Sequence, residues 1–280
     1  MPFDGERFTP ECVREIRYEH LARYAFALGL ARGKRVLDAA CGEGYGSAML
    51  ASAAASVLGV DVAPDAIAHA KARYGTQANL RFSRMDCTAL DVPAASFDMV
   101  VSFETIEHVA AQRELIAGFA RALTAEGLLI VSSPDKRTYS DISGFRNEFH
   151  VRELYRDELL ALLGEHFPQV RLYGQKLLFQ SVTWNLGNHP RTVVTSTQSA
   201  SHANPRPGLD YAPLYFIAVC SRGPLPEQLA DLALFGDREE SVYAHYNGEV
   251  RKNMAAGRRI AELEAEIIRL QDELNLRRPR

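Results

Sequence analysis

The sequence predicts a doubly wound α/β fold, in which helices cover both faces of a mostly parallel β-sheet. Three observations support this prediction: short apolar runs that suit strands buried on both faces, helix-like segments between these runs, and a glycine-rich turn after the first run. The expected parallel strands lie at residues 35–38, 57–61, 80–84, 97–103 and 128–132.

The segments between these strands have the features of helices. Residues 46–54 are rich in alanine, residues 64–74 begin with a proline suited to a first helical turn, and residues 111–123 carry apolar side chains at helical spacing. This alternation of strands and helices is typical of a doubly wound sheet. One more helix and two more strands are expected at 153–166, 170–175 and 214–220.

The chain is predicted to divide into three regions. Residues 1–34 are expected to form an N-terminal helical cap, residues 35–222 the α/β domain, and residues 223–280 a helical C-terminal extension. Within the domain, residues 181–212 are rich in Ser, Thr, Asn and Pro, and such a long polar segment predicts an insertion or a lid.

The C-terminal extension carries a narrow apolar seam. Its apolar residues repeat at spacings of three and four, with charged residues between them, at Ile260, Leu263, Ile267, Leu270 and Leu274. Such a two-position repeat is typical of a coiled coil, whereas a helix docked on a globular core normally has a wider apolar face. We therefore expect residues 258–276 to associate with a second copy of the chain or with a partner protein. A helix packed within one subunit is the alternative.

Composition limits the class of protein. A chain of 280 residues, 47% hydrophobic and 24% charged, can bury a full core. Its net charge of -3 gives no overall reason to bind nucleic acid, and none is expected as a partner. The four cysteines form no CxxC pair, which favours a cytoplasmic location. No run has the pattern of an export signal or the length to span a bilayer, so membrane insertion is not expected.

A glycine-rich stretch, VLDAACGEGYG, follows the first expected strand. In a doubly wound sheet, ligands bind beyond the carboxyl ends of the strands, at turns of this kind. Gly42, Gly44 and Gly46 allow unusual backbone angles and a close approach to a ligand. Asp61 ends the second expected strand, where a carboxylate can accept hydrogen bonds from both hydroxyls of a ribose.

The spacing of this motif argues against a dinucleotide. The dinucleotide fingerprint has the pattern GxGxxG and keeps acids out of its turn, whereas this chain has DxxxGxGxG, with Asp38 before the turn and Glu43 inside it. These acids suit a ligand that carries a cationic amino group and a sulfonium beside one carboxylate. S-adenosylmethionine has these groups and is the expected cofactor.

The combined motifs VLDAACGEGYG, LGVD, MDCTAL and FDMVVSFETIEHV resemble those of class I S-adenosylmethionine-dependent methyltransferases, in particular the small-molecule branch known as type 11. The resemblance covers residues 15–180 and the strand near 214–220. It implies a methyl acceptor beside Phe103 and Glu104, with Phe103 also lining the cofactor site. The other cofactor-binding residues that it implies, from the methionine end through the ribose to the adenine ring, are Asp38, Gly42, Gly44, Asp61, Asp86 and Cys87.

The segment FETIEHV contains the candidate catalytic residues, Glu104 and His108. Together with Glu107 and with His150, which follows the fifth expected strand, they are expected to face one crevice. These four residues suit a divalent cation, Mg²⁺ or Mn²⁺, that bridges vicinal hydroxyls and lowers their pKa. The ExxEH element resembles that of ubiquinone-pathway O-methyltransferases and of small-RNA terminal ribose methyltransferases. The alternative is a site without metal, in which His108 acts as the base, orients the acceptor or merely packs.

The class of acceptor rests on a further resemblance. EHLARYAFA followed by GKRVLDAACGEGYGSAML resembles methyltransferases of surface-glycan and O-antigen assembly, which implies O-methylation of a sugar hydroxyl in polysaccharide biosynthesis. A quinone or other small-molecule hydroxyl is the alternative acceptor. An RNA ribose methyltransferase, disfavoured by the absence of a basic stripe, and a non-catalytic scaffold are the remaining alternatives.

Overall fold

The computed structural model describes residues 15–178, 195–199, 202–206, 209, 211–236, 238 and 240–276. The chain divides into two compact units, with the boundary between Ala233 and Leu234. The residues just after the last strand of the sheet remain with the first unit, because Leu225 and Leu229 pack into its core. The helical extension therefore begins later than the expected residue 223.

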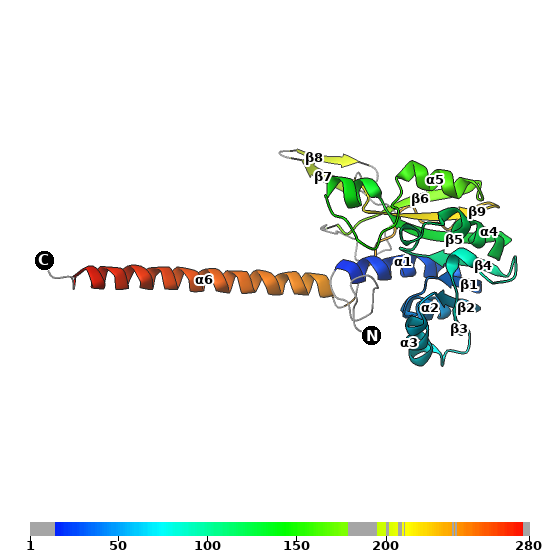
Figure 1. Ribbon diagram of the computed structural model, residues 1–280. Helices are drawn as coiled ribbons and strands as arrows, with labels where there is room; N and C mark the ends of the chain where they lie inside the picture. Colours follow the sequence, from blue (N-terminus) through cyan, green and yellow to red (C-terminus); the bar gives the residue numbers. More distant parts are fainter. Residues whose placement is uncertain are drawn as a thin grey trace, which may run out of the picture. The chain divides into compact units, whose positions relative to one another are not determined.

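In the described part of the chain, seven strands form one sheet, in the order β3-β2-β1-β4-β5-β9-β6 (Figure 1). Strands β1 to β5 are parallel, and β9 runs antiparallel to both of its neighbours. The order along the chain reverses between β1 and β4, which makes this the switch point where such sheets bind ligands. The strands are β1 (Arg35–Ala39), β2 (Ser56–Asp61), β3 (Leu80–Arg84), β4 (Phe97–Ser102), β5 (Leu123–Pro134), β6 (Gln169–Gln175) and β9 (Tyr215–Ser221).

Helices cover both faces of the sheet, as the apolar runs predict (Figure 1). Successive residues of a strand point to opposite faces, so Val36 packs into the core beneath α1, α2 and α3, while Leu37 packs into the core beneath α4 and α5. The doubly wound α/β fold is thus confirmed. The helices are α1 (Glu15–Ala31), α2 (Tyr45–Ala51), α3 (Pro64–Tyr74), α4 (Gln112–Ala122) and α5 (Arg156–Gly164).

Two elements begin three or more residues away from their predicted starts. Strand β5 begins at Leu123 because an irregular register lets its first residues pair with β4 as well. Helix α5 begins at Arg156, three residues later than predicted, because the Glu158 carboxylate accepts a hydrogen bond from the Tyr155 amide at the helix start. Glu153 is thereby left outside the helix, where it contacts His150.

The polar segment 181–212 is only partly described. Its described strands β7 (Thr195–Ser199) and β8 (His202–Arg206) pair antiparallel in a two-stranded sheet of their own. The remaining residues of the expected insertion or lid lie largely outside the described part, as do residues 1–14 of the predicted cap. Among the described helices, none combines the length and the apolar character that crossing a membrane requires.

Helices α1 and α2 pack very closely beside the glycine-rich turn. The ring of Tyr24 on α1 lies where a side chain at Gly46 would project, and a Cβ added there would be 2.0 Å from the Tyr24 ring. The hydroxyl of the same tyrosine donates to Asp38 on β1. Gly46 therefore allows α1 to reach the first strand.

We expect Gly46→Ala to lower the melting temperature, because its new methyl group must displace Tyr24 and overpacking of this kind costs about 1–3 kcal/mol. Gly29→Ala is the matched control: Gly29 lies exposed in α1, and nothing lies within 4 Å of the added Cβ. This control should be neutral or stabilising, since alanine favours a helix over glycine by about 1 kcal/mol. Calorimetry of both variants tests the packing, and equal melting temperatures would contradict it.

Candidate active site

The loops that follow β1 and β4 meet at the switch point with unusual backbone angles. Ala40 after β1 has φ 61°, and Glu104 after β4 has φ 49°, both in the left-handed region that residues with a Cβ rarely adopt. Gly42 and Gly44 share this region, with φ 54° and 88°. Left-handed residues other than glycine persist only where the surrounding structure holds them, and they cluster at functional sites.

Asp38 is fully buried beneath the glycine-rich turn. Its carboxylate accepts hydrogen bonds from the Tyr24 hydroxyl at 3.1 Å and the Ser47 hydroxyl at 2.6 Å. Burial raises its pKa to about 7, even though these two hydrogen bonds act in the opposite direction. Asp38 thus connects β1 to α1 and α2.

Asp61 holds the glycine-rich turn from the end of β2. One carboxylate oxygen accepts from the Gly42 amide and the other from the Ala63 amide, each at 2.9 Å. The side chain is nearly buried, with 7% of its surface exposed. The residue predicted to hold a ribose therefore also fixes the conformation of the turn.

The glycines of the turn make room mainly for neighbouring side chains. A Cβ at Gly44 would lie 2.7 Å from the Phe82 ring and 2.8 Å from the Ala70 Cβ, and one at Gly46 would strike Tyr24. The expectation that glycine here serves direct ligand contact thus misses the packing role that the structure gives Gly44 and Gly46. Glu43, also in the turn, is buried and faces the His69 ring at 3.2 Å.

The remaining predicted cofactor residues lie beyond the ends of β3 and β4. The Asp86 carboxylate accepts from the amide and the hydroxyl of Thr88, at 2.8 and 2.7 Å, and so caps a short 3₁₀ turn. Cys87 is buried, and burial raises the pKa of its thiol to about 12, so the group stays protonated. Phe103 is buried edge-on against Tyr24, with ring centroids 5.0 Å apart.

Glu104 is held by partners from two other elements. The Ser132 hydroxyl donates to its carboxylate at 2.6 Å and accepts from its backbone amide at 3.0 Å. The guanidinium of Arg23 lies 3.5 Å from the same carboxylate oxygen. Arg23 is itself buried, donates to the Gln175 side chain at 2.8 Å and stacks on Tyr215 at 4.4 Å. These contacts direct the Glu104 carboxylate toward α1.

Glu107 is the most deeply buried acid of the FETIEHV segment, with 1% of its surface exposed. Neither of its carboxylate oxygens has a hydrogen-bond partner among the described residues. Burial, and next the negative charge of Glu104, raise its pKa well above the usual range. A buried carboxylate without partners is costly unless a ligand or cation satisfies it.

Two histidines lie beside this carboxylate. The Nε2 atom of His108 is 3.9 Å from Glu107, and the rings of His108 and His150 meet edge-on, with centroids 4.9 Å apart. His108 Nδ1 lies 3.0 Å from the Phe149 carbonyl. A carbonyl can only accept, so this nitrogen carries the proton and Nε2 is left without one in the neutral ring. The Nδ1 atom of His150 is similarly bonded to the Glu153 carboxylate at 2.6 Å.

The structure therefore brings together three of the four predicted metal ligands. One ligand atom each from Glu107, His108 and His150 lies within 4.8 Å of the other two. Glu104 is not part of this group, because Ser132 and Arg23 hold its carboxylate. Three of the four predicted ligands are thus adjacent, and Glu104 lies apart from them.

Comparison with known proteins decides the family of this domain. Residues 36–127 match the sequence profile of a family described as "Methyltransferase domain". A probable S-adenosylmethionine-dependent methyltransferase of Mycobacterium tuberculosis is 37% identical over 162 residues, which are 57% of this chain and 58% of that protein. This chain carries a class I methyltransferase domain. The resemblance to class I S-adenosylmethionine-dependent methyltransferases is thereby confirmed for this domain.

A second relative and a solved structure extend the comparison. A ubiquinone biosynthesis O-methyltransferase of Azorhizobium caulinodans is 32% identical over 46% of this chain and 51% of that protein. An S-adenosylmethionine-dependent methyltransferase structure from Thermotoga maritima superposes with a TM-score of 0.51 at 16% identity, over 74% of this chain and 90% of that one. This likeness concerns the fold alone. The chain spans just over half the length of the two sequence relatives.

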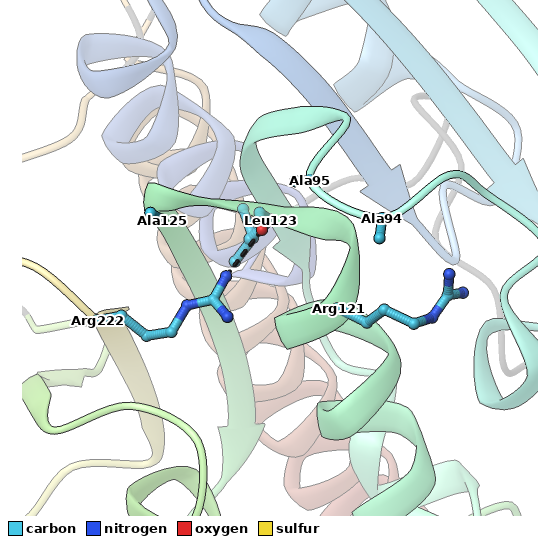
Figure 2. Close-up of a pocket in the computed structure, with 6 residues that line it drawn as sticks. All are labelled: Ala94, Ala95, Arg121, Leu123, Ala125 and Arg222. Carbon is cyan, nitrogen blue, oxygen red and sulfur yellow. Dashed lines mark hydrogen bonds between the residues drawn. The ribbon is translucent and has the colours of Figure 1, made fainter.

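An open cavity of about 400 Å³ lies at the edge of the sheet where β4 and β5 begin (Figure 2). Its lining comes from the amino ends of β4 and β5, from the end of α4 and from the residue after β9. Arg121 and Arg222 direct their guanidinium groups at backbone carbonyls there. The predicted site residues lie instead at the carboxyl ends of the parallel strands. We therefore place the active site at the carboxyl edge. The lining residues are Ala94, Ala95, Arg121, Leu123, Ala125 and Arg222.

Sequence reasoning missed several residues of the site. Arg23, Tyr24 and Ser132 are not among the residues that the sequence predicted for the site. Tyr139, which stacks on His150 at 5.3 Å within a π-helical turn (Arg137–Ile142), was missed too. That turn gives no sequence signal, whereas Arg23 and Tyr24 lie within the EHLARYAFA segment on which the resemblance to glycan-associated methyltransferases rests.

The raised pKa of Asp38 predicts a pH-dependent stability. A folded-state pKa of about 7 exceeds the ordinary value of 3.8, so the native state retains a proton that the unfolded chain releases. This contribution is full below about pH 4 and is lost as the pH rises through 7. In urea denaturation from pH 4 to 8, the free energy of unfolding of the parent should fall more than that of Asp38→Asn, on the order of 1 kcal/mol per pKa unit. Parallel pH profiles for the two proteins would show that Asp38 is not the group responsible.

Proposed function

We propose that this chain is an S-adenosylmethionine-dependent O-methyltransferase that acts on a hydroxyl of a sugar or glycan-derived acceptor. The observation that carries this proposal is the buried carboxylate of Glu107, which has no hydrogen-bond partner among the described residues and is grouped with His108 and His150 beyond the end of β4. Such a group suits the binding and deprotonation of hydroxyls.

The residues present fit the cofactor. Carboxylates stand at or just beyond the carboxyl ends of three adjacent strands, with Asp38 in β1, Asp61 at the end of β2 and Asp86 after β3. We assign Asp61 to the ribose, and the turn from Gly42 to Gly44 to the methionine end. Asp38 and Glu43 are buried beneath that end, where a cationic ligand would favour the charged forms of their carboxyl groups.

Bound S-adenosylmethionine supplies an already activated methyl group, so the protein chiefly has to align the acceptor and remove its proton. We assign proton removal to His108. Its Nδ1 proton is held by the Phe149 carbonyl, which leaves Nε2 as the acceptor atom. Glu104, fixed by Ser132 and Arg23, is the group that orients a hydroxyl of the acceptor.

As the alternative to His108 as the base, we propose that Glu107, His108 and His150 hold a divalent cation, Mg²⁺ or Mn²⁺, in which case His108 Nε2 binds the cation and does not take the proton. The orphaned Glu107 carboxylate fits this role, and the hydrogen bond from His150 Nδ1 to Glu153 is the usual support of a metal-bound histidine. His150 Nε2 lies 3.0 Å from the Asn147 side-chain amide, so cation binding at this atom replaces that contact. A bound cation would lower the pKa of an acceptor hydroxyl.

Two observations favour the quinone-type acceptor as a second candidate. Several ubiquinone biosynthesis O-methyltransferases are 32–36% identical to this chain over part of its length. The segment that supports the histidines also exposes apolar side chains, which suit a lipid-like tail, at Ile142, Phe145, Phe149 and Val151. Both candidates share the chemistry of a hydroxyl acceptor.

A transfer assay with methyl-labelled S-adenosylmethionine tests the proposal and separates the two acceptors. The probes are methyl glycosides with vicinal hydroxyls and a simple catechol, each at equal concentration. Label transferred to a glycoside supports the first acceptor, and label transferred only to the catechol supports the second. Cofactor binding without transfer to either would contradict both.

Replacing Asp61 should weaken cofactor binding. The loss of paired hydrogen bonds in a nearly buried site should reduce affinity for S-adenosylmethionine about tenfold to a hundredfold in Asp61→Ala. Asp65→Ala is the control, since Asp65 is an exposed acid in the first turn of the next helix. Isothermal calorimetry of both variants provides the measurement. Unchanged affinity in Asp61→Ala would remove this residue from the cofactor site.

Cation binding is tested apart from turnover. Electron paramagnetic resonance of added Mn²⁺ should show binding by the parent and at least tenfold weaker binding by His150→Gln. His166→Gln, which changes a histidine outside the cluster, should bind like the parent. Chelation should abolish methyl transfer and leave cofactor affinity intact. Full activity in a chelator, with no Mn²⁺ signal, would instead leave His108 as a base that needs no metal.

A further inference from the structure

Helix α6 (Ser241–Leu276) is one helix of 36 residues that includes the predicted seam. Every side chain from residue 251 to residue 274 is exposed, including all members of the seam. The exposed fractions at Ile260, Leu263, Ile267, Leu270 and Leu274 run from 42% to 61%. A continuous apolar stripe of this kind marks an interaction surface.

Local interactions do not account for the stability of this helix. Its ion pairs join residues three or four positions apart, such as Arg259 to Glu262 at 3.0 Å and Arg269 to Glu266 at 3.3 Å. Each exposed pair of this type contributes only a few tenths of a kcal/mol. Isolated helices are marginal in water, and most helical stability in proteins comes from packing of an apolar face. The stability of this helix therefore requires that the seam pack against another apolar surface.

We propose that residues 253–274 form a parallel, in-register, two-stranded coiled coil with a second copy of this chain. In heptad terms, Ile260 and Ile267 occupy a positions, and Leu263 and Leu270 occupy d positions. A β-branched residue at a with leucine at d favours two parallel strands over three or four. The residue types at these positions thus favour a parallel pair of helices.

The flanking charges agree with this arrangement. In a parallel dimer, each g residue faces the e residue of the next heptad on the other helix. Arg259 at g then faces Glu264, and Glu266 at g faces Gln271, so neither pair places like charges together. A coiled coil with a second copy is therefore free of charge repulsion along the described seam.

Asn253 fixes the alignment of the two helices. It lies one heptad before Ile260 and so takes an a position. In a parallel, in-register pair the two asparagine amides meet and bond to each other, whereas a shifted pair buries each amide against apolar side chains. A single polar residue at a is a known means of setting register.

Sedimentation equilibrium of the full chain over a range of concentrations tests the proposal with two adjacent isoleucines. The parent should approach twice its mass of 31.1 kDa. Ile267→Glu, at an a position, should return the mass to that of one chain. Ile268→Glu is the matched control, because Ile268 is exposed to 60% against 53% for Ile267 but lies outside the seam. Circular dichroism should show the domain folded in both variants.

Cysteine cross-linking tests the direction of the two helices. Under mild oxidation, Ile260→Cys should form a disulfide-linked dimer, and Ala261→Cys, one position outside the seam, should not. The native Cys41, Cys87 and Cys220 are buried, and the parent treated identically gives the background. A monomeric parent, a trimer or tetramer, or a dimer that survives Ile267→Glu would overturn the proposal. So would an unchanged mass with a large fall in melting temperature, since the helix would then pack on its own domain.

Discussion

The buried carboxylate of Asp38 is the interaction on which the rest of the active site depends. This carboxylate accepts hydrogen bonds from the hydroxyl groups of Tyr24 on α1 and Ser47 on α2. These two hydrogen bonds hold both helices against the end of β1, and Gly46 leaves the space that the Tyr24 ring needs. Since the turn between β1 and α2 is anchored on this side by Asp38 and on the other by Asp61, its left-handed residues keep one conformation.

The site has two polar halves joined by one buried arginine. The half that we propose for the cofactor lies beyond β1, β2 and β3, and the half that we propose for the acceptor lies beyond β4 and β5. Arg23 projects from the same helix as Tyr24, which bonds to Asp38, and reaches Glu104 in the acceptor half. A displacement of α1 would therefore disturb both halves at once. This coupling explains why a helix before the sheet contributes more to the site than a simple cover would.

The acceptor half also depends on long-range packing. The backbone carbonyl of Glu107 accepts hydrogen bonds from the amides of Val151 and Arg152, which docks the segment carrying His150 beside the segment carrying His108. Tyr139 then stacks on His150 from the turn after β5. Three stretches that are separate in the sequence thus form one cluster around a carboxylate that accepts no hydrogen bond from any described residue.

The sequence by itself determined the order of strands and helices, the doubly wound fold and the acids at the carboxyl ends of β1 to β4. It could do so because strands buried on both faces, helical spacing and a glycine-rich turn are local patterns. Only the tertiary structure decided the partners of those acids. Glu104 is only four residues from His108 in the sequence. Ser132 and Arg23 nevertheless hold its carboxylate apart from the group of Glu107, His108 and His150. Buried hydrogen bonds between distant elements select these partners, and no local pattern encodes which buried donor will meet which acid.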